Sequence, residues 1–373
     1  MRASQAHRLW RGRETRARIE KPLKWEEKRD RRSGENMNHA THALRKTVQA
    51  MPKAELHIHI EGSLEPEMIF ALAQRNHVEL AYESVQALRM AYGFRDLQSF
   101  LDVYYAGASV LLQEQDFADM TRAYLARALA DNVLHAEIFF DPQTHTARGV
   151  PFSSVINGLH RACREGPISA SLILCFLRHL SEDDAFATLE QALPFRDKFI
   201  GVGLDSSELG HPPEKFARVF ARCKELGLHL VAHAGEEGPP AYIWSALEVL
   251  RVERIDHGVR CLEDAELTQR LARDQVALTV CPLSNVKLGV VPSMERHNLK
   301  RMLEAGLLVT VNSDDPAYFG GYLNDNLSAA FDALPLTVTD AQRLARNSFR
   351  AAFLSEPARQ GYLDQVDAFF AAL

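Results

Sequence analysis

The amino-acid sequence predicts an α/β fold, namely a (β/α)8 TIM-type barrel with a helical insertion after the first strand. Short β-rich apolar runs alternate with amphipathic stretches from about residue 53 onward, which is typical of a parallel sheet with intervening helices. Eight such runs are present, and 373 residues suit a single barrel. The expected strands are Glu55–Ile60, Leu134–Phe140, Ser171–Phe176, Ile200–Asp205, His229–Ala234, Arg254–His257, Ala277–Cys281 and Leu308–Asn312.

Helical patterns lie between the expected strands, for example at Pro213–Leu226 and Ala241–Leu250. Gly227 follows the first of them, and glycine commonly ends helices because it adopts the left-handed conformation easily. The connection 61–132 between the first two strands is long and includes the aromatic segment 94–105. An insertion on that side of a barrel usually covers the active site, although simple packing of the aromatic side chains explains the same spacing.

The composition indicates a soluble globular protein with a sizeable core. Hydrophobic residues make up 46% and charged residues 25% of the chain. The net charge of -6 gives no reason to expect nucleic acid or an anionic membrane as a partner. No run is apolar and long enough to span a bilayer. The five cysteines are scattered, which favours a reducing compartment, the cytoplasm, over a disulfide framework.

The first 46 residues differ from the rest of the chain. They mix Arg, Lys, Glu and Ser with little apolar periodicity, and such a segment cannot bury enough apolar surface to order itself. We therefore expect residues 1–46 to be a disordered basic extension, with Met37 as an alternative start, and residues 47–373 to be a single barrel domain.

The motif His57-Ile-His59 is the first sign of a metal site. Side chains at i and i+2 of a strand point to the same face, so the two imidazoles can hold one divalent metal ion. A polar strand edge with two solvated histidines is the alternative. Four further expected strands also end in polar residues, where active sites of barrels form. The five strand-end segments are His57-Ile-His59-Ile-Glu61-Gly, His233-Ala-Gly-Glu236, Ile255-Asp-His257-Gly, Cys281-Pro-Leu-Ser-Asn285 and Asn312-Ser-Asp314-Asp315-Pro.

These segments supply a complete set of groups for a metal-dependent hydrolase. Three imidazoles and one carboxylate leave an open position for water on zinc, whose pKa the metal lowers. Glu236 is a candidate acid or base, and His257 is a candidate for orienting the water and taking its proton. Taken alone, His257 would be an ordinary loop histidine, and Asp314-Asp315-Pro an ordinary turn. The expected ligands are His57, His59, His233 and Asp314.

With these motifs in this order, the chain resembles the adenosine/adenine deaminase family of zinc aminohydrolases, from Met51 to at least Gly321. The resemblance implies one zinc ion per chain on the four ligands named above. It implies that Glu236 donates a proton to the purine N1, that His257 orients the water and that Asp315 contacts N7. Hydroxide would attack C6 and ammonia would leave. The His-x-Glu and Pro-Cys-x-x-Cys pattern of the other zinc deaminase architecture is missing.

The loop after the fourth expected strand bears on the choice of purine. Its Ser206-Ser207-Glu208 sequence is similar to that of adenine deaminases in the family, and Ile-Glu61-Gly replaces the common Leu-Asp-Gly. Free adenine carries an imidazole N–H that nucleosides lack, and Glu208 could accept it. A solvated loop glutamate is the alternative. We therefore expect deamination of adenine to hypoxanthine and ammonia in purine salvage, with Asp315, Glu208, Ser207 and Glu61 as substrate-binding residues.

Other functions stay open at this point. An adenosine deaminase shares the site, and so does a deaminase of N6-substituted adenine or adenylate derivatives. The substrate loops lack an obvious Arg/Lys cluster, which counts against a phosphorylated substrate. A silent purine- or metal-binding protein is disfavoured because Glu236 and His257 are both present. A barrel hydrolase with two metal ions would often hold them through a carboxylated lysine at a strand end. No suitable lysine is evident in this sequence, so one metal ion is expected. The sequence does not choose between zinc, iron and manganese, and it leaves the oligomeric state open, a homo-oligomer included.

Overall fold

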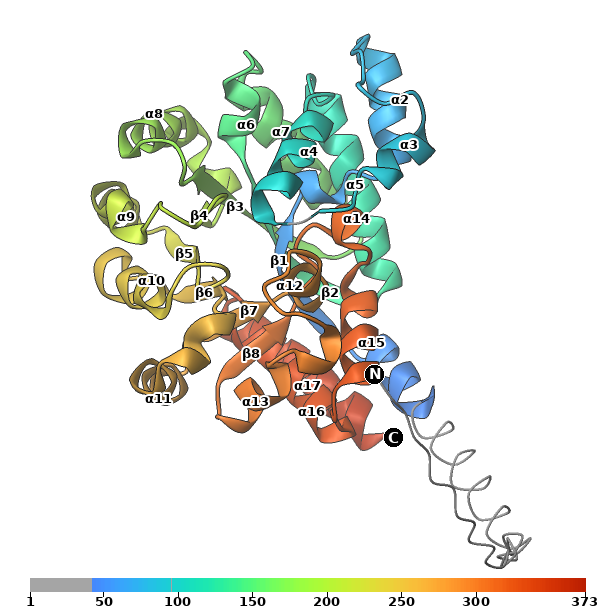
Figure 1. Ribbon diagram of the computed structural model, residues 1–373, viewed down its shortest axis with the longest axis vertical. Helices are drawn as coiled ribbons and strands as arrows, with labels where there is room; N and C mark the ends of the chain where they lie inside the picture. Colours follow the sequence, from blue (N-terminus) through green and yellow to red (C-terminus); the bar gives the residue numbers. More distant parts are fainter. Residues whose placement is uncertain (1–41, 95) are drawn as a thin grey trace, which may run out of the picture. The chain divides into compact units, whose positions relative to one another are not determined.

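Eight parallel strands form one sheet in which each strand lies beside the next one along the chain (Figure 1). The computed structural model describes residues 42–94 and 96–373. All eight predicted strands are present, with their ends within two residues of the expected positions. Their bounds are β1 Lys53–His59, β2 Val133–Phe140, β3 Ser169–Leu177, β4 Gly201–Asp205, β5 His229–Ala234, β6 Arg254–His257, β7 Ala277–Val280 and β8 Leu308–Val311.

The segment that follows β8 closes the sheet against β1. A parallel bridge joins the two. The His59 N–H donates to the Asp314 carbonyl oxygen at 3.0 Å, and the Asp314 N–H donates to the His57 carbonyl oxygen at 3.1 Å. The Leu56 N–H donates to Asn312 Oδ1 at 2.9 Å. The predicted (β/α)8 TIM-type barrel is therefore confirmed, and its seam passes through predicted site residues.

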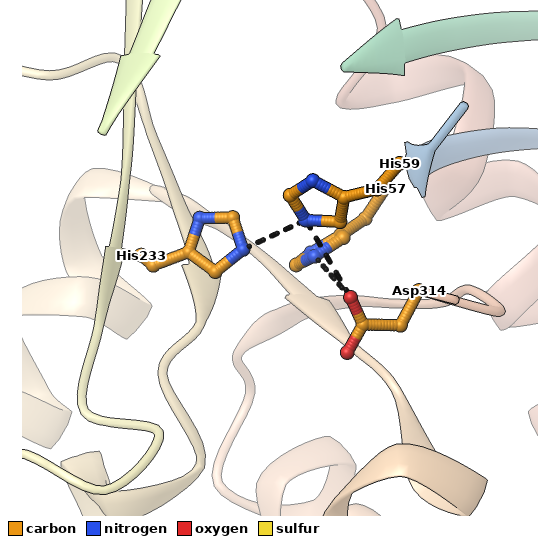
Figure 2. Close-up of side chains that lie close together, drawn as sticks. All are labelled: His57, His59, His233 and Asp314. Atoms are coloured by element: carbon orange, nitrogen blue, oxygen red, sulfur yellow. Dashed lines mark hydrogen bonds and ion pairs between the residues drawn. The ribbon is translucent and has the colours of Figure 1, made fainter. Parts of the chain in front are cut away.

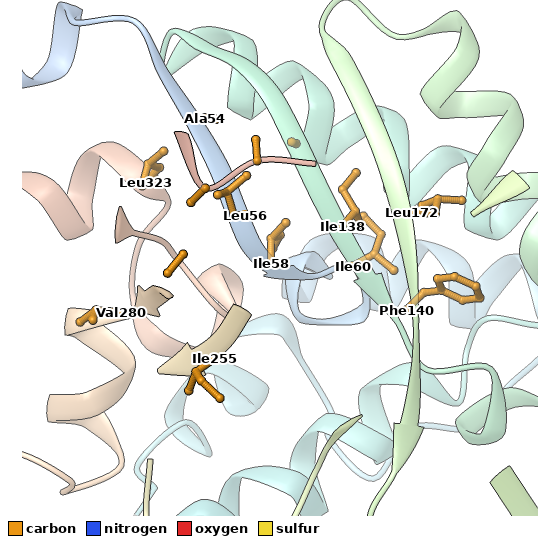
Figure 3. Close-up of a cluster of buried hydrophobic side chains, with 14 of the residues drawn as sticks. Ala54, Leu56, Ile58, Ile60, Ile138, Phe140, Leu172, Ile255, Val280 and Leu323 are labelled. Carbon is orange, nitrogen blue, oxygen red and sulfur yellow. The ribbon is translucent and has the colours of Figure 1, made fainter. Parts of the chain in front are cut away.

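Side chains of β1 alternate between two environments, as the pleat of a strand requires. The even-numbered residues belong to the apolar core between the sheet and the surrounding helices, and the odd-numbered residues Glu55, His57 and His59 lie on the opposite face, inside the barrel. This alternation places both histidines of the motif on the interior face. Figure 3 shows part of the apolar core, which includes Ala54, Leu56, Ile58, Ile60, Ile138, Phe140, Leu172, Ile255, Val280 and Leu323.

An ion pair lies inside the barrel below the histidines. Arg254 on β6 and Glu137 on β2 are both fully buried, and the Arg254 guanidinium donates to Glu137. Burial alone raises the pKa of Glu137, but the charge of Arg254 and a hydrogen bond from His135 outweigh it and lower the pKa to about 2. Glu137 is therefore a buried carboxylate that the fold keeps ionised.

The insertion between β1 and β2 is helical, as predicted. It begins with the single turn η1 Glu61–Ser63 and continues as α2 Pro66–Asn76, α3 Val85–Met90, α4 Leu97–Ala108 and α5 Glu114–Ala130. Asp96 caps α4, since its side chain accepts the Ser99 N–H at 2.8 Å and Ser99 Oγ accepts the Asp96 N–H in return. Five residues of α4 line the pocket described below, which confirms that the insertion covers that end of the barrel.

The remaining helices connect the strands and close the chain. The predicted helix 213–226 appears as η3 followed by α9, and the predicted helix 241–250 as α10 followed by η4. Gly227 has a φ of 71° and ends α9 as expected. The elements are α6 Pro142–Thr146, α7 Phe152–Glu165, α8 Glu182–Ala192, η2 Leu193–Lys198, η3 Pro213–Phe216, α9 Ala217–Glu225, α10 Pro240–Ser245, η4 Ala246–Leu250, η5 Val259–Glu263, α11 Ala265–Asp274, α12 Pro282–Lys287, η6 Met294–Arg296, α13 Leu299–Glu304, α14 Pro316–Phe319, α15 Leu323–Ala333, α16 Val338–Arg350 and α17 Glu356–Ala371.

The predicted extension falls almost entirely outside the described residues, and so does Met37. Residues 42–50 are helical, so regular structure begins before the expected boundary at residue 47. Residues 44–373 form one compact unit. Within the described part of the chain, every helix is too short or too polar to cross a membrane.

Candidate metal centre and active site

The four predicted metal ligands come together at the ends of β1 and β5 and in the segment after β8 (Figure 2). His57 Nε2 lies 3.1 Å from Asp314 Oδ1. His59 Nε2 lies 3.2 Å from His233 Nε2 and 3.6 Å from Asp314 Oδ1. One donor atom from each of the four residues lies within 4.8 Å of the other three. All four side chains are buried.

The chemistry of this donor set suits a divalent metal ion. His57 Nε2 is buried, and the polar atom that it faces is Asp314 Oδ1, another member of the predicted ligand set. Two ring nitrogens that face each other, as those of His59 and His233 do, cannot both act as acceptors towards each other. A cation shared by three imidazoles and one carboxylate satisfies all of these atoms, and this is the ligand set of a mononuclear site with an open position.

The Asp256 carboxylate lies behind the imidazoles of His57 and His233. His57 Nδ1 contacts Thr279 Oγ1 at 2.9 Å, and Thr279 Oγ1 donates to Asp256 Oδ1 at 2.9 Å. The other oxygen of Asp256 lies 3.8 Å from His233 Nδ1. Such groups fix the ring orientation of metal-binding histidines. Asp256 was not predicted as a site residue, although it stands directly before His257 in a strand-end motif.

Glu236 and His257 face each other beside the ligands. His257 Nε2 is 3.6 Å from Glu236 Oε1 and 3.7 Å from Asp314 Oδ2, and its Nδ1 lies 3.4 Å from Asn285 Nδ2. Burial, reinforced by the Asp314 charge, raises the pKa of Glu236 well above its usual value. Burial lowers the pKa of His257 to about 3. The raised pKa of Glu236 favours its protonated form, and the lowered pKa of His257 favours the neutral imidazole, so the two groups can pair a proton donor with a base.

Two of these residues have an unusual backbone. His257 has a φ of 63° and Asp314 a φ of 66°, in the left-handed region that side chains with a Cβ rarely adopt. Such conformations cost about 1–3 kcal/mol each and cluster at functional sites. Here they turn the two side chains towards the same group of ligands.

Asp315 lies next to the predicted metal ligand Asp314 and lines the pocket. Its Oδ1 is buried and has no partner in the described part of the chain. Burial and the Asp314 charge raise the pKa of Asp315 well above its usual value. A Cβ on Gly62 would lie 2.0 Å from Asp315 Oδ1, so only glycine allows this approach. The raised pKa favours the protonated form of Asp315, which can donate a hydrogen bond.

A pocket with about 390 Å³ of empty volume opens beside these groups. Its walls combine apolar side chains, mainly from α4, with the polar ends of the strands. The lining residues are His59, Leu97, Phe100, Leu101, Tyr104, Tyr105, Asp141, Asp205, Ser206, His233, Glu236, His257, Leu288, Asp314, Asp315 and Phe319. Apolar walls with a few convergent polar groups are typical of a site that binds a small molecule.

Glu208 lies outside this lining and has other partners. Oε1 accepts the N–H of Gly235 at 2.7 Å, and Oε2 accepts those of Glu236, Glu237 and Gly238 at 3.1, 2.8 and 2.8 Å. Its carboxylate is therefore occupied by the loop that carries Glu236. This arrangement does not support the prediction that Glu208 accepts a substrate N–H.

The neighbouring serines also differ from expectation. Ser206, and not Ser207, is the serine that lines the pocket. Ser206 has a φ of 73°, and its Oγ lies 3.0 Å from the Tyr105 hydroxyl and 2.9 Å from His179 Nδ1. The left-handed turn at Ser206 shifts the register of the loop, which strand periodicity alone does not reveal.

Glu61 is fully buried beneath the pocket and is not one of its lining residues. Its Oε1 contacts His145 Nε2 at 2.8 Å and accepts the N–H of Asp141 at 3.3 Å. Burial raises its pKa to about 7. In this structure Glu61 supports the segment around Asp141, so its predicted direct contact with substrate lacks a geometric basis.

Two pocket residues were missed by the sequence-based prediction. Asp141 follows β2, and Asp205 ends β4. Burial, with the Glu61 charge next, raises the pKa of Asp141, and burial together with the Asp141 charge raises that of Asp205 well above its usual value. Asp205 Oδ2 also lies 3.5 Å from His59 Nδ1. The signal for both was their place at strand ends, the same rule that identified His233 and Asp314.

Comparison with known proteins adds independent information on this site. The family model described as adenosine deaminase matches residues 52–369. An adenine deaminase of Cupriavidus metallidurans is 68% identical over 334 residues, which cover 88% of this chain and 94% of that protein.

Solved structures agree with this result. An adenine deaminase from Arthrobacter aurescens superposes with a TM-score of 0.85 at 53% identity, covering 86% of this chain and 100% of that one. An amidohydrolase from Burkholderia ambifaria with bound Zn superposes with a TM-score of 0.79 at 28% identity, covering 90% and 96%.

Proposed function

The chain belongs to the adenosine deaminase family and is an aminohydrolase, and from this premise we propose that it hydrolyses adenine to hypoxanthine and ammonia. The observation that carries the choice of adenine is the 68% identity to the adenine deaminase of Cupriavidus metallidurans across 88% of this chain. The proposed role is purine salvage. The five cysteines are free thiols, four of them buried, which suits the cytoplasm as the place of action.

We infer that zinc is the metal, held by His57, His59, His233 and Asp314. The ligand set supports zinc, and the Burkholderia ambifaria amidohydrolase contains it. A bound zinc ion supplies hydroxide at neutral pH, because it lowers the pKa of its water to about 7.

The residues of the chain carry the proton transfers. Glu236, protonated because of its raised pKa, donates to N1 of the purine and makes C6 more electrophilic. His257, neutral and 3.6 Å from Glu236, orients the attacking water and accepts its proton. Asp315 donates a hydrogen bond to N7. The water oxygen bonds to C6, and the proton held by His257 passes to the amino group. The C6–N bond then breaks, ammonia leaves, and the C6 hydroxyl returns a proton to Glu236, which gives hypoxanthine.

A side-by-side assay tests this proposal. We expect purified enzyme to turn over adenine faster than adenosine or N6-methyladenine, with hypoxanthine as the product from adenine. Adenosine turnover above that of adenine would overturn it in favour of a nucleoside deaminase, and the same result with N6-methyladenine would favour an N6-substituted substrate. Metal analysis of the same sample should give one zinc ion per chain.

A further inference from the structure

Asp141 has the features of a group that binds substrate. It is 3% exposed and lines the pocket beside Asp205 and Ser206. Its Oδ2 accepts the Tyr104 hydroxyl at 3.0 Å, which fixes the carboxyl group. Its Oδ1 is buried and has no hydrogen-bond donor among the described residues other than the neighbouring Asp205 carboxyl. The neighbour on that side is the Asp205 carboxyl, which offers a hydrogen bond only when one of the two acids carries a proton.

The position of Asp141 at the start of α6 supports a role in binding substrate. Asp141 is the N-cap residue of α6, where an aspartate side chain ordinarily accepts a backbone N–H of the first turn. Here its side chain makes no such bond. The side chain turns into the pocket and gives up the stabilisation of the helix end, which is typical of a functional residue.

The hydrogen-bonding needs of adenine match this arrangement. Glu236 and Asp315 both line the pocket, and the proposed function places them at the acceptors N1 and N7. The remaining edge of the ring carries the N9–H donor, which needs an acceptor in a water-excluded site. Asp141 Oδ1 is a buried acceptor that faces the Asp205 carboxyl, and both residues line the same pocket.

Building on the proposed function, we propose that Asp141 accepts the N9–H of adenine and makes the enzyme specific for the free base. We assign Asp205 a different role, because its Oδ2 lies 3.5 Å from Nδ1 of the proposed metal ligand His59 and orients that imidazole. A nucleoside lacks the N9–H and places a sugar carbon against Asp141. The buried carboxyl then loses its water without gaining a partner, which opposes binding.

The test compares adenine with 9-methyladenine in the wild-type enzyme and in Asp141→Leu, a change that keeps the size of the side chain and removes the acceptor. We expect the wild type to prefer adenine strongly. In Asp141→Leu we expect kcat/KM for adenine to fall by about 10- to 100-fold, as loss of a charged hydrogen bond implies, with less than about threefold change for 9-methyladenine. Asp183→Leu makes the same substitution at an exposed position of α8 and should match the wild type.

A second readout removes dependence on turnover. The dissociation constants of hypoxanthine and 9-methylhypoxanthine should converge in the Asp141 variant and differ in the wild type. Where Asp141→Leu does not fold, Asp141→Asn carries the test, with the same direction and a smaller loss.

Three outcomes would overturn the inference. The first is an Asp141→Leu enzyme whose preference for adenine over 9-methyladenine stays within threefold of the wild-type value, while the wild type deaminates adenine. This result would leave the proposed function intact and reject the role of Asp141. Another is loss of a second metal equivalent per chain in the variant, which would make His59, Asp141 and Asp205 a cation site. The last is a wild type without adenine deamination, which removes both the proposed function and this inference.

Discussion

Glu208 Oε2 accepts the backbone N–H of Glu236 at 3.1 Å. The same carboxylate also accepts three neighbouring N–H groups, so one buried side chain fixes the loop that carries Glu236, the proposed proton donor. Its negative charge adds to burial and to the Asp314 charge in raising the pKa of Glu236. Position and protonation of Glu236 are therefore both linked to Glu208.

Glu208→Gln should lower kcat by at least about tenfold, because the amide turns a donor towards backbone donors and leaves some of them unpaired. The preference for adenine over 9-methyladenine should stay unchanged, since Glu208 does not line the pocket. Steady-state kinetics on both substrates measure this. Glu225→Gln, on the exposed side of α9, is the control. A collapse of the base preference would instead place Glu208 at the substrate.

Glu236→Gln should reduce kcat by more than about a thousandfold and leave the zinc content at the wild-type level, because Glu236 supplies a proton and is not a ligand. In the wild type, activity should fall as pH rises through the raised pKa of Glu236, since the donor form is lost there. The pH dependence of kcat/KM and metal analysis test these points. An active Glu236→Gln enzyme would contradict the assigned role.

Removal of the metal by a chelator should abolish activity, and added zinc should restore it, because the nucleophile depends on the metal. Full activity in protein shown to be metal-free would contradict the mechanism. His57→Ala should lose the metal itself, which atomic absorption of the purified variant measures.

Asp256→Asn should weaken metal binding by about 10- to 100-fold, as is usual for groups that orient metal-binding histidines. The Asp256 carboxyl faces both His57, through Thr279, and His233. Competition with a chelator of known affinity measures the effect. Unaltered affinity in a folded variant would mean that Thr279 alone orients His57.

The Glu137–Arg254 pair predicts a pH dependence of stability. The folded-state pKa of Glu137 is lowered to about 2 from 4.5. Its contribution to the free energy of unfolding is therefore complete above about pH 4.5 and is lost as pH falls towards 2. The contribution is about 3 kcal/mol, an order-of-magnitude figure. Urea unfolding of metal-free protein between pH 2 and 5 should show a shallower pH dependence in Glu137→Gln. Equal slopes would contradict the lowered pKa.

The sequence predicts that His57, His59, His233 and Asp314 come together, because strand periodicity and barrel topology suffice to place them. His57 and His59 share the inner face of β1, and parallel strands bring His233 to the same end of the barrel. The predicted barrel and the covering insertion follow from the same patterns.

The substrate residues were harder to predict because tertiary pairing decides them. Glu208 looks like a free loop carboxylate until the backbone N–H groups of the next loop are placed around it. Glu61 is buried against His145, which lies more than eighty positions away in the chain. Ser206 replaces Ser207 because of one left-handed backbone angle.

The seam between β1 and the segment after β8 has a consequence for biosynthesis. Leu56 and Asn312, which form a hydrogen bond across the seam, are 256 positions apart. One edge of the first strand therefore stays unpaired until most of the chain has been synthesised. The same closure joins His57 and His59 to Asp314. Completion of the barrel and completion of the metal-binding set are thus one event. A ribosome-bound chain that ends before residue 314 has an unpaired strand edge and lacks one proposed ligand. In the finished chain, a metal ion bound to His57, His59 and Asp314 would link the two ends of the sheet.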